Sequence, residues 1–153
     1  MKLINVFFLS MAIMILGSCA NQQAKADPKA EMAEEQALWD EVMSFHDQGM
    51  SEMKDIAALK KYLSGNQDKL TDDNSKKIAE MAIAKLDEAE KGMWDWMHDL
   101  VKLEDLQKDK THAEIMAYLT TQKEVVSNVK EQIKASVASG KQVRTLIKEE
   151  EQK

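Results

Sequence analysis

The sequence predicts an all-α protein, and three observations support this prediction. Only five Gly and one Pro occur in the 153 residues, so residues that break helices are rare. Beyond its N-terminal segment the chain is rich in Ala, Glu, Lys, Met, Gln and Leu, which favour helices. Apolar residues recur at alternating steps of three and four, which places them on one face of a helix. We therefore expect an antiparallel three-helix bundle with long helices at about 28–64, 72–104 and 111–148.

The first predicted helix begins at Asp27-Pro28. Asp is a favourable N-cap, Pro suits the first helical position, and Glu31 follows in the first turn. A broad apolar face then runs from Leu38 to Leu63, and Ser64-Gly65-Asn66 is expected to end the helix.

The second predicted helix follows Thr71-Asp72-Asp73-Asn74, which places cap formers and acidic groups at the positive end of the helix dipole. Its apolar residues form a heptad seam, in which each step is three or four residues. The seam consists of Ala79, Ala82, Leu86, Ala89, Met93, Trp96, Leu100 and Leu103.

The third predicted helix follows a polar connector at 105–110. Thr111 and Glu114 have the spacing of a capping box, and a second seam runs from Ile115 to Ile147. Gly140 lies in register with this seam, so we expect the helix to continue through it. Because the connectors are short, an up-down-up arrangement is favoured, and the alternative is a longer helical hairpin that dimerises to complete its core.

The N-terminal segment has the pattern of a secretory signal. Lys2 supplies the positive start, residues 3–16 are almost wholly apolar, and small residues precede Cys19. A transmembrane helix is the alternative, but the apolar run is short and no basic residues follow it. Leu16-Gly17-Ser18-Cys19 resembles the lipobox of bacterial lipoproteins. This resemblance implies a cleaved signal peptide at 1–18 and a lipid-modified Cys19.

Cys19 is the only cysteine of the chain, so no internal disulfide can form. Lipidation explains a lone cysteine in an exported protein, and attachment by two or more acyl chains is stable. Residues 19–27 are then a lipidated tether and residues 28–150 a helical domain, held on the cell envelope and facing the periplasm or the outside. Ala20 follows the cysteine in place of Asp, and in the lipoprotein family this favours the outer membrane over the inner one.

Composition and motifs narrow the function of the domain. The net charge of −6 argues against nucleic-acid binding, which depends on Lys and Arg. We find no Gly-rich phosphate loop, haem-attachment motif or di-metal motif in the sequence. We therefore expect no enzyme and no cofactor, but a membrane-anchored helical scaffold or a domain that binds an envelope protein partner.

A metal-binding function is the alternative. His46 lies near the middle of the apolar face of the first predicted helix, with Met50 and Met53 nearby, and a hairpin would bring Met93 to its level. Imidazole and thioether groups suit Cu(I), so the alternative function is that of a lipoprotein that binds copper or another soft metal. The simpler interpretation is that these methionines fill the core and that His46 is a buried residue with a hydrogen-bonding partner.

Four further stretches resemble a group of small helical bacterial lipoproteins that carry the label "viral A-type inclusion protein". The resemblance covers roughly residues 35–135 and implies an all-helical lipoprotein without implying an activity. The stretches are Glu41-Val42-Met43-Ser44-Phe45-His46-Asp47, Met53-Lys54-Asp55-Ile56, Gly92-Met93-Trp94-Asp95-Trp96-Met97 and Ala117-Tyr118-Leu119.

Overall fold

The computed structural model describes residues 27–152, and over that range the chain is all-α, as predicted. The predicted signal peptide, Cys19 and most of the predicted tether lie outside the described residues. The elements in chain order are α1 (Pro28–Ser64), the 3-10 turn η1 (Gln67–Lys69), α2 (Asp73–Asp99), α3 (Leu103–Asp109) and α4 (His112–Glu150).

Local chemistry defines the starts of the long helices. The Asp27 carboxylate accepts a hydrogen bond from the Lys29 backbone N–H (3.0 Å), which satisfies one of the free donors at the start of α1. At the start of α4 the capping box predicted for Thr111 and Glu114 is confirmed. The first helix has the predicted bounds, and α4 continues through Gly140 as expected.

The prediction for the second helix was wrong at its C-terminal end. The helix ends at Asp99, and the predicted polar connector contains most of a separate short helix, α3. At the break, the Val101 backbone N–H donates to the Tyr118 hydroxyl of α4 (2.8 Å) instead of continuing the helix. Leu103 and Leu106 of α3 are both buried. The break therefore exchanges helical hydrogen bonds for burial of two leucines at the end of the molecule.

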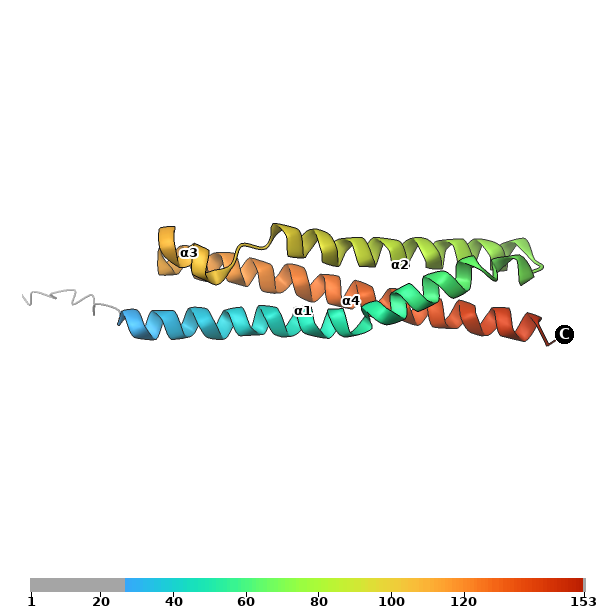
Figure 1. Ribbon diagram of the computed structural model, residues 1–153, viewed down its shortest axis with the longest axis horizontal. Helices are drawn as coiled ribbons and strands as arrows, with labels where there is room; N and C mark the ends of the chain where they lie inside the picture. The colour runs from blue at the N-terminus through green and yellow to red at the C-terminus, as the bar shows by residue number, and fades with distance from the viewer. Residues whose placement is uncertain (1–26, 153) are drawn as a thin grey trace, which may run out of the picture.

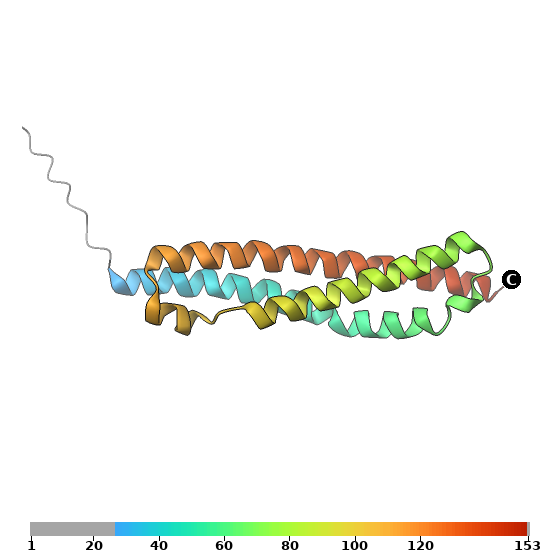
Figure 2. The ribbon, with the colours of Figure 1, turned by 90° about the horizontal axis from the view of Figure 1, so that it is seen from above.

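The three long helices lie side by side in an elongated molecule (Figure 1). The colours show that α1 and α4 run in the same direction and α2 in the opposite one. The most extensive contacts are between α1 and α4, followed by those between α2 and α4. Figure 2 shows that the start of α1, α3 and the start of α4 gather at one end, while η1 and the C-terminus lie at the other.

The buried apolar side chains form two separate clusters. The main cluster extends along α1, α2 and α4 and contains the seam residues of α2 from Ala79 to Trp96. The end cluster consists of Leu103, Leu106, Ile115 and Leu119, with Leu38, Trp39 and Tyr118 packed against it. Thus α3 covers one end of the molecule and has its own small core.

Candidate functional site

His46 of α1 lies against α2, and each of its two ring nitrogens contacts another side chain. Nδ1 lies 2.9 Å from Oδ1 of Asp47, the next residue of α1. Nε2 lies 3.1 Å from the sulfur of Met97 on α2. The side chain is 16% exposed, so the ring is largely covered but reachable from solvent. The structure therefore joins the predicted histidine to a thioether that the sequence analysis did not select.

The three predicted thioethers have other positions. Met93 is fully buried, and a methyl group added at Gly49 would lie 2.5 Å from its Cε atom. Met93 therefore fills the space that the missing side chain of Gly49 leaves between the helices. Met50 and Met53 are partly buried against the main cluster. The two ring nitrogens of His46 instead lie in contact with Asp47 and Met97.

Trp96 forms an aromatic wall beside this histidine. The two ring centroids are 5.7 Å apart and the planes are inclined by 33°. Trp96 is buried, as predicted, and its Nε1–H donates to Oε1 of Gln122 on α4 (2.9 Å). This hydrogen bond fixes the indole orientation, so the His46 ring packs against a rigid surface.

A second polar cluster lies where α1, α3 and α4 meet. Its centre is Glu35, which is only 4% exposed and accepts two hydrogen bonds from other elements. Gln107 of α3 donates Nε2–H to Oε2 (2.7 Å), and His112 of α4 contacts Oε1 through Nδ1 (2.9 Å). The sequence does not reveal this cluster, because Glu35 is one of many helical acids and its partners are 72 and 77 residues away.

The charge around His112 stabilises its protonated form. The hydrogen bond to Glu35 raises the pKa of the His112 imidazole above the ordinary value of 6.5, and the nearby Glu31 and Glu34 add to the effect. The Glu34 carboxylate is 3.5 Å from Nε2. Both ring nitrogens can then donate to carboxylates, and α4 is tied to α1 through an ion pair.

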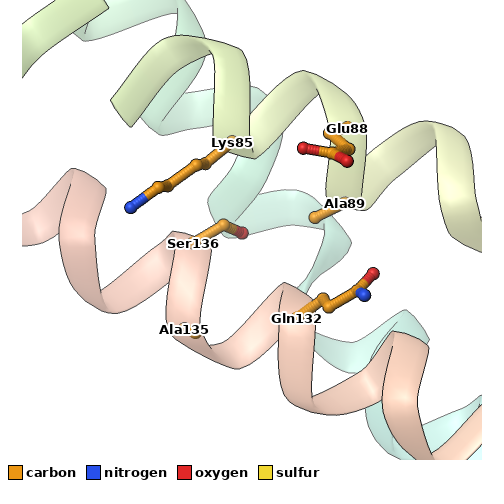
Figure 3. A pocket seen from close by; sticks show the side chains of 6 residues that line it. All are labelled: Lys85, Glu88, Ala89, Gln132, Ala135 and Ser136. Carbon is orange, nitrogen blue, oxygen red and sulfur yellow. The ribbon is translucent and has the colours of Figure 1, made fainter. Parts of the chain in front are cut away.

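A shallow pocket lies between α2 and α4 (Figure 3). It is lined by three small residues and three longer polar ones: Ala89, Ala135, Ser136, Lys85, Glu88 and Gln132. The Ser136 hydroxyl donates to the Ile133 carbonyl (2.8 Å), so its proton is already used within α4. The small residues of α2 and α4 leave this depression between the helices. Its polar side chains do not point toward one another (Figure 3), so they do not form a ligand site.

Residues 27–152 contain no group of three or more His, Cys, Asp or Glu side chains placed to hold a metal ion. In that same range, none of the helices combines the length and the apolar character needed to cross a bilayer. Comparison of the chain with protein-family models, curated proteins and solved structures found no match.

Proposed function

We propose that this protein is a bacterial envelope lipoprotein whose mature part is an antiparallel three-helix bundle that serves as a non-enzymatic scaffold or partner-binding domain. The observation that carries the proposal is the sequence Leu16-Gly17-Ser18-Cys19 after a short apolar segment. The arrangement of α1, α2 and α4 supports the bundle (Figure 1). The acyl chains on Cys19 would hold the domain on a membrane, with the outer membrane favoured by Ala20.

The position of the first helix supports an anchor at one end of the molecule. The described chain begins at the end where α3 and the start of α4 lie (Figure 2). The tether residues 20–26 span only about 25 Å when extended. The proposed bundle therefore works close to its membrane, and the sides of its long helices remain free to contact a partner.

Metabolic labelling tests the anchor. Cells that express the full chain are fed an alkyne fatty acid, and the protein is then isolated from the membrane fraction and examined by mass spectrometry. We expect the label on a chain that begins at Cys19, and no label on a Cys19→Ser variant. A labelled Cys19→Ser chain, or a wild-type chain that keeps residues 1–18 and carries no lipid, would contradict the proposal.

Trp94 is the residue through which we propose that a partner binds. Trp94 lies on α2 and is 55% exposed. Tryptophan is a frequent anchor at protein interfaces. A photo-crosslinking residue at position 94 in intact cells should give one reproducible adduct. The same residue at Ala84, also exposed on α2, should not give it. Identical adduct patterns at the two positions would contradict a specific partner site at Trp94.

A further inference from the structure

The contacts of His46 determine which ring nitrogen is available to bind a ligand. The Asp47 carboxylate is an acceptor, so it stabilises the neutral tautomer that carries its proton on Nδ1. In that tautomer Nε2 has a free lone pair, which faces the Met97 sulfur at 3.1 Å. A thioether sulfur is also an acceptor and has no proton to donate. Two electron-pair donors on different helices thus face each other.

We propose that His46 Nε2 and Met97 Sδ form a binding site for a soft monovalent cation of the Cu(I) or Ag(I) class. Imidazole nitrogen and thioether sulfur are both ligands that such cations accept, and hard cations such as Mg²⁺ and Ca²⁺ prefer oxygen. This site goes beyond the proposed scaffold and does not depend on membrane anchoring.

Asp47 has the position of an orienting carboxylate. Histidines that bind metals commonly donate their second ring N–H to a carboxylate, which fixes the tautomer and makes the ligating nitrogen more basic. The 2.9 Å contact between Asp47 Oδ1 and His46 Nδ1 supplies this arrangement without any rearrangement of α1. Its negative charge also partly balances the charge of a bound cation.

Trp96 and Met97 adapt the site to a soft cation. The Trp96 ring, 5.7 Å from that of His46, adds a polarisable and rigid wall beside the ligands. A cation between Nε2 and Sδ requires the two atoms to move apart from 3.1 Å. Met97 permits this movement because its side chain is unbranched and only partly buried. Met93 is unsuited to this role, since its methyl group fills the space over Gly49.

Silver titration tests the site, because Ag(I) undergoes no redox change on binding. The full chain with Cys19→Ser, which removes the one thiol that could bind silver more tightly than a thioether, is titrated with silver nitrate in detergent and chloride-free buffer and followed by calorimetry. We expect one silver ion per chain. Met97→Leu, which removes the sulfur but keeps a similar volume, should weaken binding at least tenfold. Met81→Leu is the matched control because Met81 is 51% exposed on the same helix, and it should bind as the wild type does.

Methyl NMR of the same Cys19→Ser chain, which keeps every methionine, provides a readout that does not depend on the folding of a methionine variant. With ¹³C-methyl methionine, the first equivalent of silver should move the Met97 signal and leave the exposed Met81 and Met32 signals in place. The proposal is overturned if Met97→Leu and Met81→Leu bind silver equally. It is also overturned if the first equivalent moves Met81 or Met32 instead of Met97, or if the chain binds Zn²⁺ in preference to silver at this position.

Discussion

At the scale of single residues, Glu35 has the most demanding environment of the described ionisable groups. A buried carboxylate costs several kcal/mol unless it has partners, and Glu35 has partners on both α3 and α4. Its negative charge also lies close to the start of α4, where the helix dipole is positive. Glu35 therefore joins three elements at one end of the molecule, and His112 is the partner whose charge depends on pH.

The first prediction concerns this pH dependence. Because the hydrogen bond to Glu35 raises the pKa of His112 in the folded state, protonation favours folding. The contribution is complete below the ordinary value of 6.5 and disappears as the pH rises through the raised folded pKa. Urea unfolding should therefore show that His112→Gln loses more stability at about pH 5.5 than at about pH 8.5.

His98→Gln is the matched control, because His98 is exposed on α2 and is not one of the residues that contact Glu35. The stability change of His98→Gln measures the general effect of removing a titrating histidine from the chain. A loss in His112→Gln that is the same at both pH values, or larger at the higher one, would show that the ion pair with Glu35 makes no contribution.

At the scale of helical elements, the α4 cap has a defined role. The Thr111 hydroxyl accepts from the Glu114 backbone N–H (3.4 Å), and the Glu114 carboxylate accepts from the Thr111 backbone N–H (2.8 Å). We predict that Thr111→Ala lowers the free energy of unfolding by about 1 kcal/mol. Thr111→Ser keeps the hydroxyl and should recover most of the loss in the same denaturation experiment. Equal stability of the Ala and Ser variants would contradict a role for the cap.

Two glycines within helices should respond in opposite ways to alanine. At Gly92 the nearest atom to an added methyl group is Gln132 Oε1 at 4.0 Å, so Gly92→Ala should raise stability by about 0.5–1 kcal/mol through helix propensity. At Gly140 the methyl group would lie 3.1 Å from Leu59 Cδ1 and 3.2 Å from Leu86 Cδ1. Both leucines are buried, so overpacking, which costs about 1–3 kcal/mol, should exceed the gain and lower the stability. Thermal denaturation should place Gly140→Ala at least about 1 kcal/mol below Gly92→Ala. The reverse order would show that an added methyl group fits where α4 packs against Leu59 of α1 and Leu86 of α2.

The sequence predicted those elements that depend on neighbouring residues. The start of α1 at Asp27 and the capping box of α4 were predictable because both use contacts within three residues. The break after α2 was not predictable, since it depends on a bond from Val101 to Tyr118, 17 residues later. Leu103 continues the heptad spacing of α2, so the apolar pattern is the same for a continuous helix and for a broken one.

The candidate site shows the same division. Helical periodicity placed His46 on a covered face and brought the second helix to its level, but the contacting sulfur is that of Met97, one turn from the selected Met93. A shift of one turn between neighbouring helices moves a contact by four residues without changing either seam. Glu35 could not be distinguished from other helical acids, because its burial depends on α3.

At the scale of the whole molecule, the separation of the two apolar clusters suggests two levels of stability. The main cluster spans α1, α2 and α4, whereas the end cluster is made by α3 and the start of α4 against the start of α1. Smaller cores open at lower free energy than the complete molecule. We therefore expect α3 and the first turns of α4 to open while the remaining helices stay packed.

Native-state hydrogen exchange with two variants tests this order of opening. Ile133→Val removes one methyl group from the main cluster and should lower protection there by about 1 kcal/mol. It should leave protection in α3 unchanged, because Ile133 stays packed when the end cluster opens. Leu119→Ala weakens the end cluster and should lower protection in both regions, since complete unfolding also loses the Leu119 contacts. If Ile133→Val lowers protection in α3 as much as in the main cluster, the molecule opens only as one cooperative unit, and α3 does not open independently.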